Sequence, residues 1–268
     1  MNKIILILLS SVIFSCSGNI LSDVASKSND EDYLYQAQQK INDEDFDGAI
    51  ALITTKMSSS SQTHVTAREA LASAYGGKCG LIFMNYVNAL AAATTGSAMM
   101  ILKTPFVGKA VDPTSCRLAL TTMDQIGPAT SRTLNQNFFT AILGMVLMGS
   151  ALRGHIDNSP AIGDGTNDVN ICTTVTNAQM DDIIIGFGYM SQNISSVSAS
   201  VVGSGSLATL TGVTSTCQAA GINCQITDPA IITAQIRNFF RDLTNTQQYG
   251  IGSFNTTGND LLIPGACP

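Results

Sequence analysis

The sequence predicts an all-α fold in which antiparallel helix pairs are stacked and followed by a helical C-terminal half. Apolar residues recur at helical spacing along most of the chain. These segments are bounded by helix signals, such as Asp-Pro at a start and Gly-Gly or Gly-Pro at an end. Of the 268 residues, 45% are hydrophobic and 12% are charged, so the chain can bury a sizeable core.

The first sixteen residues predict an export signal that ends in a cysteine. Lys3 precedes an apolar run that is too short to remain as a membrane span. The end of the run, IFSC at 13–16, resembles the lipobox of bacterial lipoproteins, in which the Cys after a small residue is lipidated. We therefore expect residues 1–15 to be a signal peptide and Cys16 to carry the acyl anchor. The alternative is an ordinary secretory signal, with Cys16 as an unmodified thiol.

The residues after Cys16 bear on location and partners. Residues 16–31 are polar and lack a sustained period, which predicts a flexible tether. In the resembled lipoproteins, an Asp after the lipid-bearing Cys favours the inner membrane. Ser17 stands there, so the resemblance implies anchoring in the outer membrane, on its periplasmic side or at the cell surface. The net charge of −6 excludes nucleic acid as a partner.

The remaining six cysteines predict disulfides, because an even number in an exported chain favours pairing. Cys217 and Cys224 flank a short loop that contains Gly, and they form the best local pair. The other four can pair in three ways, and buried free thiols are the alternative: Cys79, Cys116, Cys172 and Cys267. No CxxC or HxxxH spacing occurs, so zinc is not expected.

Residues 32–93 predict four helices. Two lie within 32–57 and meet at a polar turn over 42–45. A third begins near Thr63 or Thr66 and ends at Gly76-Gly77, and a fourth covers about 79–93.

Two short motifs in this part resemble tetratricopeptide repeats. DFDGAI at 45–50 is similar to the turn and second-helix start of such a repeat, and ALASAY at 70–75 is similar to the first helix of the next one. With the lipobox and ASAYGGKCGL at 72–81, the chain resembles bacterial tetratricopeptide-like lipoproteins, including the TatT-like class. This resemblance implies a repeat-like stack over 32–93. It also implies a protein partner in the envelope, such as the binding subunit of a TRAP transporter.

The helical prediction continues to the C-terminal side, so we expect residues 32–268 to form a single helical domain. The apolar stretch 138–152 lies within a helix over 135–153 and is shorter than the ~20 residues that cross a bilayer, which predicts a buried central helix. Further helices are expected over 96–102, 113–127, 177–198 and 229–245, with Asp228 as the cap of the last, and loops over 154–176 and 199–228.

Two acidic motifs suggest cation binding. DEDFDGAIALIT at 43–54 imitates a calcium loop, but Thr54 replaces the bidentate Glu, and a helix corner explains the acids equally well. GDGTND at 163–168 copies a phosphatase and P-type ATPase signature without the strand and nucleophilic Asp that such chemistry needs, so we expect a loop. His64 and His155 lack partners at ligand spacing, which indicates surface residues or caps.

The sequence favours a non-enzymatic, lipid-anchored envelope protein that serves as a helical scaffold for protein partners, without a cofactor. One alternative is a periplasmic binding module that handles a small apolar ligand together with a transport system. That alternative predicts a pocket lined by residues such as Met84, Phe138, Met145 and Met148. A second alternative is a metal-dependent enzyme that uses Asp157, Asp164 or Asp168.

Overall fold

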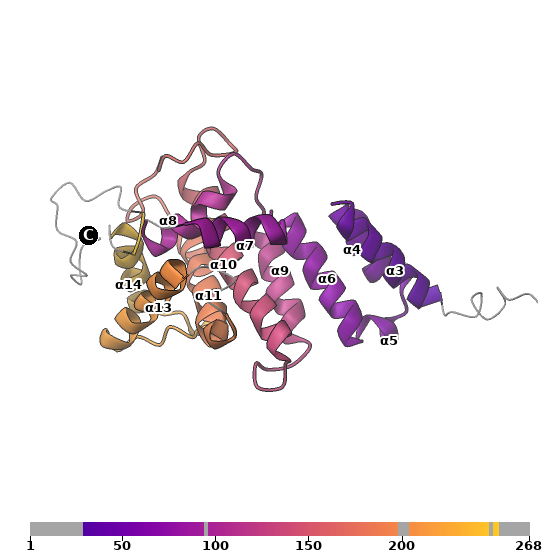
Figure 1. The fold of residues 1–268 in the computed structure, drawn as a ribbon. Coiled ribbons are helices and arrows are strands. Elements are labelled where there is room, and N and C mark those ends of the chain that lie inside the picture. The colour runs from indigo at the N-terminus through magenta and orange to yellow at the C-terminus, as the bar shows by residue number, and fades with distance from the viewer. Residues whose placement is uncertain (1–28, 94–95, 198–203, 247–248, 252–268) are drawn as a thin grey trace, which may run out of the picture.

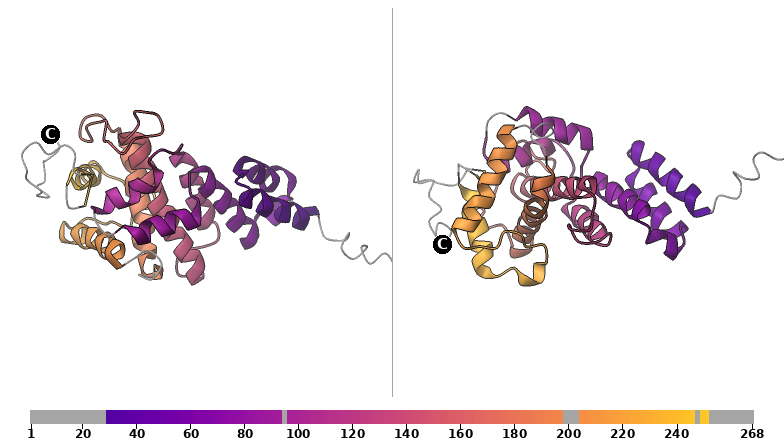
Figure 2. Two further views of the ribbon diagram at one scale, coloured as in Figure 1. Left: turned by 45° about the horizontal axis from the view of Figure 1, so that its top comes forward. Right: turned by 60° about the horizontal axis from the view of Figure 1, so that its bottom comes forward.

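Every regular element that the structure describes is a helix, so the predicted all-α class is confirmed. The computed structural model describes residues 29–93, 96–197, 204–246 and 249–251. The helices form an elongated array with α3 and α4 at one end and α13 and α14 at the other (Figure 1). Two further views show that the N-terminal helices project from a wider body that contains the rest of the chain (Figure 2). The signal peptide, Cys16 and most of the tether lie outside the described residues.

The N-terminal unit, defined as residues 29–78, is a helical layer whose main helices are α3, α4 and α6. It contains α3 (Asn29–Asn42), α4 (Phe46–Ala51) with one π-helical turn after it (Leu52–Lys56), the short α5 (Ser59–Gln62), and α6 (Val65–Lys78). Helix α6 packs against both α3 and α4, and these helices together enclose a small core that is separate from the main one. Helix α3 begins inside the segment predicted as tether, because Asp30 anchors its first turn to Ser58 and Ser61.

Helix α6 packs most extensively against α9 (Pro113–Asp124), which is not the next helix in the sequence. The segment between them contains α7 (Phe83–Ala92) and α8 (Ala98–Lys103). Helix α8 packs on the central helix α10 (Leu134–Ile156). The disulfide Cys79–Cys116 joins the end of α6 to α9 with its Cα atoms 5.2 Å apart.

The centre of the wider body is the packed pair of α10 and α11 (Asn177–Asn193). The two helices approach closely because Gly144 and Gly186 face one another. A Cβ on Gly144 would lie 2.6 Å from the carbonyl oxygen of Gly186, and one on Gly186 would lie 2.7 Å from that of Gly144. Helix α10 is long and apolar enough to cross a membrane, yet 83% of its most apolar window is buried inside the protein.

The C-terminal half differs from the sequence prediction at two helices. The loop predicted over 199–228 is wrong in part, since α13 (Ser204–Ala219) lies there and buries Leu210, Val213 and Cys217. Its many Ser, Thr and Gly residues have modest helix propensity, and burial of this apolar face overrides it. Helix α14 (Ala234–Asn245) begins later than predicted, because Asp228 caps a single 3₁₀ turn and Thr233 caps the helix itself.

Candidate functional site

The four residues predicted to line an apolar pocket do not meet at one site. Met145 and Met148 are fully buried in the main core, whereas the Met84 side chain is 63% exposed on α7. Phe138 is half-buried and packs its ring against Phe83, with the ring centroids 6.2 Å apart. The structure thus does not bring the four residues together, because the close approach of α10 and α11 places Met145 and Met148 in packed interior, away from the exposed Met84.

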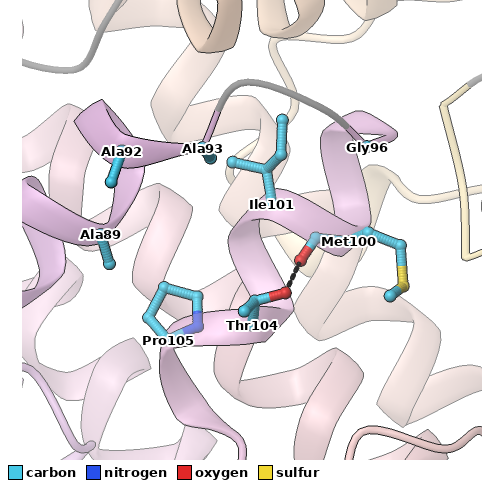
Figure 3. A pocket seen from close by; sticks show the side chains of 8 residues that line it. All are labelled: Ala89, Ala92, Ala93, Gly96, Met100, Ile101, Thr104 and Pro105. Carbon is cyan, nitrogen blue, oxygen red and sulfur yellow. Dashed lines mark hydrogen bonds between the residues drawn. The ribbon is translucent and has the colours of Figure 1, made fainter.

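An apolar cavity lies instead between α7 and α8, with a volume of about 440 Å³ (Figure 3). Its lining residues come from these two helices, the connection between them and the turn after α8: Ala89, Ala92, Ala93, Gly96, Met100, Ile101, Thr104 and Pro105. The Thr104 hydroxyl donates to the Met100 carbonyl oxygen at 2.7 Å, so the hydrogen bond is internal to the wall. No lining residue is ionisable, which suits an uncharged apolar group.

A second hollow, which we call the polar groove, lies between α3 and α6 in the N-terminal unit and has a volume of about 270 Å³. Its lining residues are mostly polar: Gln38, Ile41, Asn42, Thr66, Glu69, Ala70 and Ser73. Of these, Ile41 and Ala70 are apolar, and Ala70 is buried. The groove therefore offers hydrogen-bonding side chains around a small apolar floor.

Glu69 connects the polar groove to the central body. Its Oε1 accepts a hydrogen bond of 2.8 Å from Gln136 Nε2. Gln136 belongs to the capping box of α10, since its Oε1 accepts from the Thr133 amide at 2.8 Å. The orientation of Glu69 is thus fixed by the first turn of α10.

The GDGTND segment forms a loop that is held from inside by a buried ion pair. Lys103 Nζ lies 3.4 Å from Asp157 Oδ2, and both side chains are fully buried. Lys103 also donates to the Gly165 carbonyl and to Asn167 Oδ1, each at 2.9 Å. Asp157 accepts from the amides of Asp164 and Gly165. These polar groups satisfy one another, which accounts for two charges in the interior.

The other acids of this loop also face backbone amides. Asp168 Oδ2 accepts from the amides of Asn158 and Ser159 at 2.8 and 2.7 Å. Hydrogen bonds from Thr166 lower the pKa of Asp164 below its ordinary value. Within the described ranges, no group of three or more His, Cys, Asp or Glu residues is placed to hold a metal ion. Asp157, Asp164 and Asp168 therefore support the loop.

The calcium-like motif adopts the helix-corner alternative. Asp45 caps α4 by accepting from the Gly48 amide at 3.0 Å, and it also accepts from Lys40 Nζ at 2.5 Å. Asp47 pairs with Lys78 Nζ at 2.6 Å. Since Phe46 already begins α4, the twelve residues do not form the open loop that calcium needs.

The two histidines have different surroundings. His64 is exposed and stands at the cap position of α6 without a side-chain cap bond. His155 Nε2 lies 3.3 Å from Asp182 Oδ2, and its Nδ1 lies 3.3 Å from Gln179 Nε2. Arg117 also pairs with Asp182, so the imidazole is part of a polar contact between α9, α10 and α11 that the sequence did not reveal.

A second polar cluster missed by the sequence prediction joins α9 to α11. The Tyr189 hydroxyl donates to Asp124 Oδ2, and Arg132 Nη1 lies 3.6 Å from Asp124 Oδ1. Burial raises the pKa of Asp124, while the contacts with Tyr189 and Arg132 oppose that shift. Burial and the Asp124 carboxylate raise the pKa of Tyr189, so its hydroxyl remains protonated. The cluster spans residues far apart in sequence, and no local pattern marks it.

The predicted local disulfide is confirmed: Cys217 and Cys224 are bonded, with Cα atoms 5.9 Å apart. Of the pairings left open, the structure contains Cys79–Cys116, with both sulfurs near the Ser150 hydroxyl. Cys172 is disulfide-bonded as well, and Cys267 lies outside the described residues.

Comparison of the chain with protein-family models, with curated proteins and with solved structures finds no match.

Proposed function

We propose that this protein is a non-enzymatic scaffold of the bacterial envelope, anchored by lipid on Cys16, which binds a protein partner in the polar groove between α3 and α6. The observation that carries the proposal is the groove itself, where polar side chains surround an apolar floor on an exposed helical layer. Such a surface offers both the apolar contact and the hydrogen bonds of protein interfaces.

The packing of the N-terminal unit supports a repeat-like scaffold. Helix α6 rests on both α3 and α4 and then pairs with α9, so each helix is covered by the next along the array. Stacks of this kind present long grooves to partners. The motif-bearing acids in the central body bond to backbone amides or to Lys103, which assigns them to support of the fold.

Site-specific photo-crosslinking in living cells tests this proposal. A photoreactive residue is placed at Gln38 or Ser73 in the polar groove and, as the control, at the exposed Thr54 on the turn after α4. We expect an adduct of discrete mass at the two groove positions and none at Thr54. No adduct, or equal adducts at all three positions, would contradict a partner in the groove. Mass spectrometry of the exported protein tests for acyl chains on Cys16.

The apolar cavity between α7 and α8 favours a second candidate function, the binding of a small uncharged apolar molecule. Its volume of about 440 Å³ falls in the range of small-molecule sites, and its lining offers methyl and methylene groups. The test is titration with an apolar fluorescent probe. Ala92→Phe should fill the cavity and abolish binding, whereas Ala91→Phe, at the exposed neighbouring position outside the lining, should leave it unchanged. Equal binding by both variants would remove this candidate.

A further inference from the structure

The polar groove carries amide side chains that have no internal partner. Gln38 and Asn42 are exposed on α3, and neither forms a side-chain hydrogen bond within the described part of the chain. A carboxamide offers both a donor and an acceptor, as does each peptide unit of a polypeptide. A helical segment already uses its own backbone groups, so these amides can pair with the backbone of an extended segment.

The groove is also acidic. Glu69 lines it, and its Oε1 is held by Gln136 while Oε2 accepts from no group among the described residues. Asp43 and Glu44 directly follow Asn42 at the end of α3, where both are exposed and form no ion pair in the described chain. Glu69 thus contributes one carboxylate to the lining, and two more exposed carboxylates directly follow the lining residue Asn42 in the chain.

The basic residues of the N-terminal unit leave this charge uncompensated. Residues 29–78 contain eight acidic and four basic side chains, a net charge of −4 within a chain of −6. Lys40 and Lys78 are paired with Asp45 and Asp47. Arg68 donates to the Gln125 carbonyl outside the groove, and Lys56 ends the turn after α4, outside the groove lining. The field at the groove therefore attracts cations and repels acidic segments.

We propose that the polar groove binds an extended segment of a partner protein that carries lysine or arginine. The backbone of the segment pairs with Gln38 and Asn42, and its cationic side chains contact Glu69 and the acids that follow Asn42. The inference rests on the proposed scaffold function and names the chemical class of the partner.

Fluorescence anisotropy with the full-length protein tests the charge preference. The probes are two labelled octapeptides, one of alternating lysine and serine and one of alternating glutamate and serine. We expect the lysine peptide to bind, with an affinity that falls as salt is added, and we expect no binding of the glutamate peptide. The new amide oxygen in Glu69→Gln can still accept from Gln136, and this variant should lower the affinity for the lysine peptide about three- to ten-fold.

The matched control is Asp32→Asn. Asp32 is exposed on α3, the other helix of the groove, but lies outside the groove lining and bonds only to Gln36, so the variant makes the same charge change without touching the site. It should leave the affinity within about two-fold. Equal weakening by Glu69→Gln and Asp32→Asn would show general attraction to an acidic surface and would overturn the inference.

The backbone part of the inference has its own test. The double variant Gln38→Ala, Asn42→Ala should lower the affinity for the lysine peptide. Methylation of alternate backbone nitrogens in the peptide should lower its affinity for the unsubstituted protein. Unchanged binding in both cases would overturn the extended-segment assignment. Crosslinking at Ser73 with equal affinity for the two octapeptides would refute the basic class while the scaffold function stands. Absence of crosslinking at the groove would refute both.

Discussion

The N-terminal unit and the α10–α11 body are both helical, but they fill their interiors differently. The core of the N-terminal unit consists mostly of alanines, with Ile53 and Met57 as its larger members. The body has a continuous core of large side chains, a glycine-mediated helix contact and a buried Lys103–Asp157 pair. A thin alanine core leaves polar faces exposed along the polar groove, whereas the packed body encloses its charges. The difference teaches that the unit with the small alanine core leaves a polar hollow at its surface, whereas the hollow of the body, between α7 and α8, is apolar.

The largest effect should come from breaking the buried ion pair of the body. Lys103→Ala leaves the Asp157 charge uncompensated in the interior, and we expect a loss of about 3–5 kcal/mol in the free energy of unfolding. The exposed Lys78–Asp47 pair of the N-terminal unit is the contrast, and Lys78→Ala should change stability little. Urea denaturation measures both. Equal losses would refute the contrast between buried and exposed pairs.

The next effect concerns the bond between the two regions. Removing the Cys79–Cys116 disulfide by a double alanine substitution should cost about 3–4 kcal/mol, because the bond closes a long loop. Removing Cys217–Cys224 should cost less, about 2–3 kcal/mol, since only 7 positions separate these cysteines against 37 for the first pair. Denaturation of the oxidised proteins gives both values, and the reverse order would contradict the loop-length argument.

A smaller effect should follow from adding a methyl group at the α10–α11 contact. Gly144→Ala places a Cβ against the Gly186 carbonyl oxygen, and we expect a loss of about 1–3 kcal/mol. Gly205→Ala in α13 is the control, because a Cβ there meets nothing within 4 Å. That variant should be neutral or slightly more stable, owing to the better helix propensity of alanine. Thermal denaturation compares the two; a stable Gly144→Ala protein would show that the body can relax around its core.

The smallest effect is an opposite pH dependence in the two regions. Burial raises the pKa of Asp124 above 3.8, so its contribution to stability is complete below that pH and is lost as the pH rises through the folded pKa. Hydrogen bonds from Ser58 and Ser61 lower the pKa of Asp30, so its contribution is complete above 3.8 and is lost as the pH falls through the folded pKa.

These signs give a paired measurement. Relative to the unsubstituted protein, Asp124→Asn should gain stability as the pH rises above 3.8. Asp30→Asn should gain relative stability as the pH falls below 3.8. Urea denaturation across about pH 3 to 7 detects both slopes. If the stability of each variant changed with pH in parallel with that of the unsubstituted protein, neither carboxyl would differ in pKa between the folded and unfolded states.

Local signals in the sequence predicted where helices begin better than they predicted which helices pack together. Asp112 before Pro113 marks the start of α9, and α10 and α11 begin within one residue of the predicted positions, where the structure places the Thr133 and Thr176 capping boxes. These signals work because a cap satisfies the amides of its own helix. In contrast, the pairing of α6 with α9 depends on contacts across 35 or more positions, which periodicity cannot encode.

The candidate site was predicted less well, for the same reason. Met145 and Met148 lie on α10, and their sequence pattern does not show whether they line a cavity or pack against a neighbouring helix. Gly144 and Gly186 decide this, because they let α10 and α11 approach closely and bury both methionines. Glu69 has no local motif, and its place in the polar groove follows from how α6 lies against α3 and from its bond to Gln136.

The sequence by itself determined the helical class and the local Cys217–Cys224 bond, because each depends on residues close together in the chain. The export signal and the anchor at Cys16 rest on the same kind of local pattern and remain predictions. Only the tertiary structure decided that α9 covers α6, that Lys103 is buried with Asp157, and which surfaces remain hollow. Those outcomes depend on how the side-chain volumes and charges of distant segments fit together. That fit is decided only when the helices pack against one another.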